Sequence, residues 1–202
     1  MITEFILSVI VAYLIGSLNA SIIFSKLTGK EDIRTKGSGN AGMTNMLRNN
    51  GKKSAAFVLI VDGLKGVLAV LLVRLFTDSI IWMCCASFFV VLGHVYPIYF
   101  GFRGGKGIAT ALFSIGALPH GWIISLILIG LFLPLVYFTR IVSIASLTCT
   151  ATYPLLVYLF NKESKENIIY SFIILALLFF THRSNIVRLI KGQENKFGGY
   201  KK

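Results

Sequence analysis

The sequence is poor in charged residues, and acidic residues are especially few. Lysine, arginine, aspartate and glutamate make up 14% of its 202 residues, and only eight of them are acidic. Apolar residues account for 55% of the chain, and the mean hydropathy is +0.77. This composition is too apolar for an ordinary soluble domain, and the long uncharged runs are typical of membrane-spanning helices. We therefore predict an integral membrane protein.

The sequence also lacks the patterns of a metal site, a redox cysteine pair and a cleaved signal peptide. Cys84, Cys85 and Cys149 lack the spacing of a metal site or a redox pair. The eight acidic residues and three histidines are too dispersed for a metal cage. We therefore predict chemistry without a metal or another cofactor. The first basic residue is Lys26, so the positive region of a cleaved signal peptide is absent and we expect the first apolar segment to stay in the membrane.

The apolar residues group into seven segments, against the ~20 residues that a helical crossing needs. These segments are 3–24, 54–76, 79–97, 107–118, 121–138, 143–160 and 167–181. Segment 107–118 would reach only ~18 Å across a ~30 Å hydrocarbon core, so either the loop before it dips into the bilayer or the membrane is thinned there. The seven segments predict an all-α membrane protein with seven transmembrane helices. Because no repeat or linker is visible, we predict a single domain, residues 1–202.

The basic residues indicate an orientation. Most of the 20 lysines and arginines lie in loops 25–53 and 98–106, at Arg140 and in the tail from Arg183 to Lys202, and such residues are retained on the cytoplasmic side. This places the amino terminus outside and the carboxyl terminus in the cytoplasm. The net charge of +12 could also indicate nucleic acid, but the basic groups are short and juxtamembrane, so we expect anionic lipid headgroups as the bulk partner and no nucleic acid.

A segment rich in glycine and small polar residues, 37–48, is the strongest candidate for binding an anion. Its backbone amides can converge on phosphate, neutral side chains add donors, and an arginine adds a two-pronged charge. The candidate residues are Ser38, Gly39, Asn40, Thr44, Asn45 and Arg48. The alternative is an ordinary glycine-rich turn whose arginine faces lipid. A nucleotide-binding P-loop is excluded, because no Gly-x4-Gly-Lys-Ser/Thr run is present.

Two more segments have similar chemistry. Gly104, Gly105, Lys106 and Gly107 precede an expected helix start, where the helix dipole favours an anion. His182 and Asn185 follow the last apolar segment, and His182 is a general base, a substrate-binding group or an ordinary interfacial histidine. Ser143 and Ser146 lie at the same expected membrane level as these groups and could each supply a hydroxyl.

Asp62, Lys65 and His94 are ionisable residues that fall inside apolar segments. Asp62 and Lys65 stand three residues apart and can pair on one face of a helix, either as a structural pair or as a contact to substrate. His94 either orients another group or is an ordinary interfacial histidine.

Two common catalytic signatures are absent. No histidine is followed five positions later by aspartate, the usual arrangement in glycerolipid acyltransferases, and no Gly-x-Ser-x-Gly elbow of a serine hydrolase occurs.

The combined motifs resemble one family, the bacterial acyl-phosphate:glycerol-3-phosphate acyltransferases of the PlsY type. The motifs, in the order and at the chain length expected of that family, are Gly37–Asn45 with Arg48, Asp62–Gly66, Gly93–Pro97, Gly104–Thr110, and His182–Arg188 with Gly192 and Glu194. Arg103 departs from the pattern, since lysine is common there, but the charge is kept.

The resemblance implies the first step of phospholipid synthesis in the bacterial cytoplasmic membrane. A fatty acyl phosphate would give its acyl group to the 1-hydroxyl of glycerol 3-phosphate, without coenzyme A or acyl carrier protein as direct donor. Under this hypothesis Ser38, Arg48, Lys106 and Asn185 hold the phosphates, while His182 and Ser143 orient the acceptor or the acyl carbonyl. We expect a monomer with its active site facing the cytoplasm. The alternatives are a transporter for a phosphorylated metabolite and a non-catalytic lipid-binding protein.

Overall fold

The computed structural model describes residues 2–162 and 164–196. These residues form nine α-helices and two short 3-10 helices without any strand, so the predicted all-α fold is confirmed. Glu163, Lys201 and Lys202, which contribute to the charge distribution above, lie outside the described residues. The chain divides into two compact units, Met1–Pro119 and His120–Lys202, and each is described by itself.

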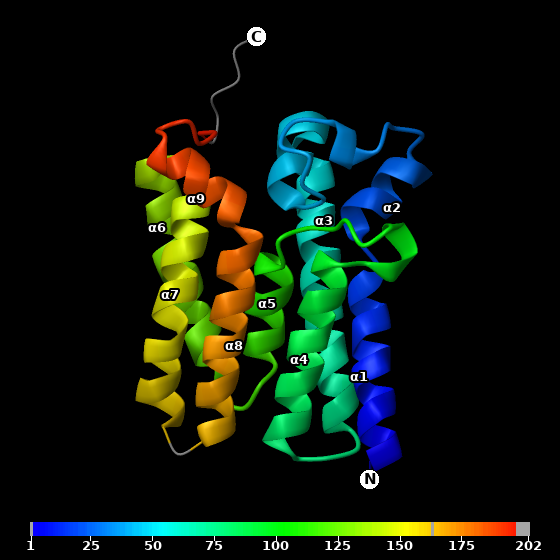
Figure 1. Cartoon of the computed structure of the whole chain (residues 1–202), viewed down its shortest axis with the longest axis vertical. Coiled ribbons are helices and arrows are strands. Elements are labelled where there is room, and N and C mark those ends of the chain that lie inside the picture. Colours follow the sequence, from blue (N-terminus) through cyan, green and yellow to red (C-terminus); the bar gives the residue numbers. More distant parts are fainter. Residues whose placement is uncertain (1, 163, 197–202) are drawn as a thin grey trace. The chain divides into compact units, whose positions relative to one another are not determined.

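The first unit is built around three long helices (Figure 1). α1 (Ile2–Ser17) packs along α4 (Ile80–Val95), and α3 (Met43–Arg74) packs against α4 and α5 (Ile108–Gly116). The short elements are α2 (Ala20–Leu27), η1 (Ile33–Thr35) and η2 (Ile98–Phe100). Glycines allow α1 and α4 to approach closely, because a side chain at Gly16 would collide with the Val90 backbone and one at Gly93 with the Tyr13 backbone.

The apolar segment 3–24 is not one straight helix. It breaks after Ser17, and α1 and α2 meet at a bend of 46°. Asn19 explains the break, because its side-chain oxygen accepts a hydrogen bond from the backbone N–H of Ile22 and thereby starts a new helix. Because Asn19 has apolar neighbours on both sides, the sequence pattern did not indicate this helix start.

The helix α3 begins eleven residues earlier than the apolar segment at 54 suggested, at Met43. Thr44, Asn45 and Arg48 therefore lie on helical turns rather than in a loop. Gly51 interrupts the helix with a φ of 83° and a ψ of 178°, a conformation that other residues adopt only with strain. The part before Gly51 and the part after it are two helices joined at a kink.

The second unit is a set of helices in which neighbours along the chain pack together (Figure 1). α6 (Gly121–Thr139) packs against α7 (Val142–Asn161), and α7 packs against α8 (Lys165–Thr181). α9 (Arg183–Ile190) follows α8 after a bend of 61°. His182 occupies this bend.

Among the described residues, four helices are long and apolar enough to cross a membrane, and up to six spans result if each bent pair counts as one. α5, with nine residues, would reach only ~14 Å at 1.5 Å per residue. It is too short to cross a bilayer, as the length of segment 107–118 indicated. Along α3, exposed apolar side chains recur at helical spacing, which is the pattern of a lipid-facing stripe; they are Phe57, Ile60, Leu64, Leu68 and Leu71. The count of seven spans and the orientation of the termini stay predictions.

Candidate active site

Residues 37–42, here called the first glycine loop, are held in place by the side chain of Asn45. Asn45 is buried at the start of α3. Its Nδ2 donates to the carbonyls of Ile33 and Lys36 at 3.0 and 2.9 Å, while its Oδ1 accepts from the Ser38 N–H at 3.0 Å. Three hydrogen bonds from one buried side chain fix the path of the loop.

Two glycines permit this path. Gly37 and Gly39 have φ values of 57° and 69°, in the left-handed region that favours glycine. A side chain at Gly37 would also collide with the side chains of Asn45 and Asn49. The sequence motif therefore specifies the conformation of the loop.

The polar groups of this segment differ in exposure. Ser38 and Gly39 are exposed, whereas Asn40, Thr44 and Arg48 are half-buried. Asn45, predicted as a phosphate ligand, uses its side chain to build the loop. The phosphate contacts predicted for all six residues stay predictions.

Residues 104–107, here called the second glycine loop, pair with the end of α4. The N–H of Gly104 donates to Val95 O at 3.0 Å, and the N–H of Gly105 donates to His94 O at 3.1 Å. Gly107, with a φ of 85°, precedes the first turn of α5. Half-buried Lys106 therefore lies beside the amino terminus of α5, as the sequence predicted, and this end of a helix favours an anion.

The structure joins the two glycine loops. The N–H of Ala41 donates to Gly104 O at 3.4 Å, and the Nδ2 of Asn19 donates to Ala41 O at 3.2 Å. Ala41 is fully buried in the apolar core between α2 and α3. The two glycine-rich segments, far apart in sequence, therefore lie against each other in the first unit.

An arginine outside the predicted site strengthens this junction. Arg34 Nη1 donates to the carbonyls of Phe100 and Arg103 at 2.6 and 3.1 Å, just before the second glycine loop. Its Nε and Nη2 bind the Asp32 carboxylate, and these hydrogen bonds hold the pKa of Asp32 below its ordinary value. Sequence reasoning missed Arg34. Its carbonyl partners are distant along the chain, and no local motif distinguishes it from the neighbouring cations.

In the second unit, His182 is buried at the bend between α8 and α9. Its Nδ1 lies 2.8 Å from Leu178 O and 3.3 Å from Thr181 Oγ1. A carbonyl only accepts, so Nδ1 carries the proton, and Nε2 is then the acceptor nitrogen of the neutral ring. This tautomer is the one that can receive a proton at Nε2.

A carboxylate orients Asn185. Glu194 Oε1 accepts from Asn185 Nδ2 at 2.8 Å, and Glu194 Oε2 accepts from Arg188 Nε at 2.8 Å. The Glu194 side chain is 6% exposed and that of Arg188 32%, so the carboxylate is sheltered while the guanidinium is partly open to solvent. The motif contained Glu194, but only the structure shows that it holds both Asn185 and Arg188.

Ser143 lies in the first turn of α7. Its hydroxyl is buried and has no hydrogen-bond partner among the described residues. Ser146, one turn later, is also buried. A buried hydroxyl without a partner is uncommon, because it forfeits a hydrogen bond that water would provide.

The candidate residues therefore form two groups, one in each unit. The structure brings together the two glycine loops with Arg48 on the adjoining helix in the first unit, and Asn185 with Glu194 and Arg188 in the second. Within residues 2–162 and 164–196, no three His, Cys, Asp or Glu side chains gather as metal ligands.

Comparisons with known proteins identify the family. Residues 6–192 match the family model described as glycerol-3-phosphate acyltransferase. The glycerol-3-phosphate acyltransferase of Neisseria meningitidis serogroup C (strain 053442) is 42% identical over 199 residues, covering 95% of this chain and 96% of the relative. That of Thermoanaerobacter sp. (strain X514) is 42% identical over 193 residues, covering 96% of each chain.

Two solved structures share the fold. The crystal structure of PlsY (YgiH), an integral membrane glycerol 3-phosphate acyltransferase, matches in its glycerol 3-phosphate form with a TM-score of 0.89 and 38% identity over 96% of each chain. The lysophosphatidic acid form matches with a TM-score of 0.87 and 36% identity over 96% of each chain. The chain belongs to the glycerol-3-phosphate acyltransferase family.

Proposed function

We propose that this membrane enzyme transfers the acyl group of a fatty acyl phosphate to the 1-hydroxyl of sn-glycerol 3-phosphate, giving lysophosphatidic acid and phosphate. The joined glycine loops, flanked by Arg48 and Lys106, carry this proposal. They offer two cations to phosphate, which both substrates contain. The solved relatives, named for their glycerol 3-phosphate and lysophosphatidic acid forms, support the acceptor and the product.

The chemistry asks for positioning more than for a covalent nucleophile. An acyl phosphate is a mixed anhydride, so its carbonyl carbon is already activated. The acceptor hydroxyl forms the new ester bond, the bond from the acyl carbon to the phosphate oxygen breaks, and inorganic phosphate leaves. Ser38, Arg48, Lys106 and Asn185 hold the phosphates, and Ser143 and His182 orient the acceptor or the carbonyl.

The hydroxyl proton goes either to His182 or to a substrate phosphate. The bond from His182 Nδ1 to Leu178 O supports the first route, since it leaves Nε2 as the acceptor. Asn185, with its amide nitrogen bound to Glu194, is held in a fixed orientation three residues further on. These contacts give His182 and Asn185 the rigidity that a binding or proton-accepting role needs.

Replacing His182 with glutamine tests the proton route. If His182 is the base, we expect His182→Gln to lower kcat by roughly 100-fold, at the lower end of typical general-base contributions, across a wide pH range. His120→Gln is the matched control, because His120 is exposed and has no assigned chemistry. A loss of only a few-fold in a folded His182→Gln protein would assign the proton to the substrate phosphate instead.

We also propose that the chain is a single domain over residues 1–202 with seven transmembrane helices and works as a monomer. The amino terminus lies outside the cell and the carboxyl terminus in the cytoplasm, with the active site facing the cytoplasm at the bacterial inner membrane. The exposed apolar side chains of α3 and the basic loops support this arrangement.

The direct test is turnover by the purified protein. It is incubated with labelled glycerol 3-phosphate and palmitoyl phosphate, without added metal, and in parallel with palmitoyl-coenzyme A. Lysophosphatidic acid from the acyl phosphate alone supports the proposal, and product only from coenzyme A overturns the donor assignment. Uptake of glycerol 3-phosphate into proteoliposomes without any product would favour a transporter.

A further inference from the structure

A charged cluster of Asp62, Lys65 and His94 is buried in the first unit, behind the second glycine loop. Asp62 and Lys65 lie one turn apart on α3, with Nζ and Oδ1 2.8 Å apart, and His94 lies near the end of α4. Their exposed fractions are 2%, 6% and 4%. Charges so deeply buried are costly, and they are normally found where they are paired or functional.

Lys65 is held within the protein by three contacts. Its Nζ donates to Leu18 O at 2.9 Å, lies 3.0 Å from His94 Nδ1, and forms an ion pair with Asp62 Oδ1 at 2.8 Å. The Leu18 carbonyl is available because it lies at the break between α1 and α2. Lys65 thus ties the helix break, α3 and α4 together, which favours a structural pair over a substrate contact.

The contact with Lys65 also sets the proton on the His94 ring. His94 Nδ1 lies 3.4 Å from Asp62 Oδ1, but its nearer partner, at 3.0 Å, is the Lys65 ammonium group. Since an ammonium group only donates, we assign Nδ1 as the acceptor and the ring proton to Nε2. The Nε2 edge faces the second glycine loop, because a side chain built on Gly105 would collide with it. The backbone of His94 holds the same residue, since the Gly105 N–H donates to His94 O at 3.1 Å.

We propose that Lys65 is a positioning residue that acts through His94. Lys65 fixes the ring, the ring supports Gly105 from behind, and Gly105 sets where the adjacent Lys106 meets phosphate. This deepens the proposed function and rests on it for the kinetic readout. Asp62 holds Lys65 in place by its ion pair.

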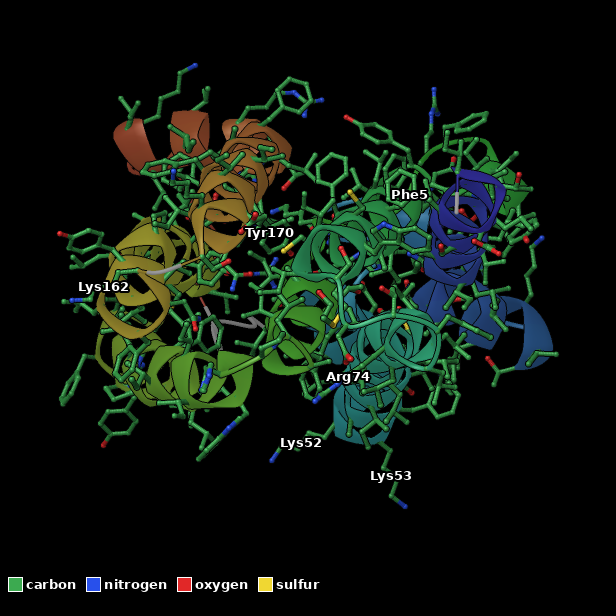
Figure 2. All side chains as sticks on the ribbon, turned by 90° about the horizontal axis from the view of Figure 1, so that it is seen from below. Phe5, Lys52, Lys53, Arg74, Lys162 and Tyr170 are labelled. Atoms are coloured by element: carbon green, nitrogen blue, oxygen red, sulfur yellow. The ribbon has the colours of Figure 1, made fainter. Side chains whose placement is uncertain are left out.

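The kinetic test compares Lys65→Met with Lys53→Met in the full chain. The exchange and the helix are the same, but Lys53 is exposed, and Figure 2 shows it pointing away from α3. We expect Lys65→Met to raise the KM for at least one of the two phosphate-bearing substrates about tenfold, with a smaller change in kcat, while Lys53→Met behaves as the unaltered protein. An unchanged KM with a lower kcat would mean only a smaller active fraction and would overturn the proposal.

A second variant covers the case in which Lys65→Met does not fold. Removing Lys65 alone leaves the Asp62 charge buried without its partner, so Asp62→Asn/Lys65→Met removes both charges together. We expect the same rise in KM. If this folded double variant has an unaltered KM, Lys65 and Asp62 do not position the loop.

A double-mutant cycle tests whether Lys65 acts through His94. His94→Asn removes the ring that faces Gly105 and keeps a short polar side chain. If Lys65 acts through the ring, adding Lys65→Met to His94→Asn should change KM by less than twofold, because effects along one path are not additive. If the KM of the double variant instead changes by the product of the two single effects, Lys65 acts by an independent route and the proposal is overturned.

Hydrogen exchange separates this proposal from the proposed function. In Lys65→Met we expect faster exchange of the amides of residues 104–107 than in Lys53→Met, with the helix α4 unchanged. Faster loop exchange together with an unaltered protein that makes no lysophosphatidic acid would refute the function but keep the positioning role. Unchanged loop exchange would refute the positioning role in either case.

Discussion

Exchange of Lys106 for alanine is expected to lower kcat/KM by about 100-fold or more, the range seen when one charge-stabilising donor is removed from an active site. Lys106 is the cation of the second glycine loop and directly precedes Gly107 and the amino terminus of α5. Its charge would stabilise phosphate both on the bound substrate and as the leaving group. Alanine leaves the backbone amides in place but removes this charge. Lysophosphatidic acid formation measured against substrate concentration checks the result.

The control for Lys106 is Lys53→Ala, which removes an exposed lysine outside the proposed site (Figure 2). Lys106→Arg, which keeps a cation, should recover part of the activity. Thermal unfolding of each variant establishes that the protein is folded. Near-normal turnover in folded Lys106→Ala would remove Lys106 from the mechanism.

Gly104→Ala is the second exchange with a large expected effect. A side chain at Gly104 would collide with the carbonyl oxygen of His94 and approach Val95 O and Pro97. Backbone atoms cannot turn aside as a flexible side chain can, so the second glycine loop must move away from α4. The bonds from Gly104 to Val95 and from Ala41 to Gly104 would then weaken. We expect kcat/KM to fall by at least tenfold, because misplaced phosphate ligands cost both binding and alignment.

Gly130→Ala is the matched control for this loop. Gly130 lies in α6, and nothing lies within 4 Å of a Cβ built there. Alanine has a higher helix propensity than glycine by about 1 kcal/mol, so this variant should be at least as stable as the unaltered protein and equally active. If Gly104→Ala and Gly130→Ala have the same kcat/KM, the close packing of the second glycine loop has no part in catalysis.

Local chemistry explains what the sequence could predict. The uncharged runs predicted helices, and the structure has a helix or a bent pair of helices at each of the seven apolar segments. The spacing of Asp62 and Lys65 predicted their contact, since residues three apart share a helix face. The clustered glycines predicted loops, and residues 37–42 and 104–107 lie outside the helices. Each of these inferences depends on residues within a few positions of one another.

Features that depend on distant residues could not be predicted in the same way. Arg34 binds carbonyls 66 and 69 residues away, and nothing near it in the sequence indicates this. The start of α3 at Met43 follows an extended Gly42 without a side-chain cap, so the usual signal for a helix start is missing. Asn45 was predicted to face phosphate because its amide is a good donor. Only the fold shows that the Asn45 side chain is already hydrogen-bonded to Ile33, Lys36 and Ser38.

The kink at Gly51 determines how α3 fits a bilayer. An unbroken helix over Met43–Arg74 would be roughly 48 Å long at 1.5 Å per residue, which far exceeds a hydrocarbon core of about 30 Å. After the kink, the remaining part is roughly 35 Å long and matches that thickness with a modest tilt. The short part before Gly51 carries Thr44, Asn45 and Arg48. The position of one glycine along the chain therefore divides α3 into a part long enough to cross a bilayer and a short part that carries these polar residues.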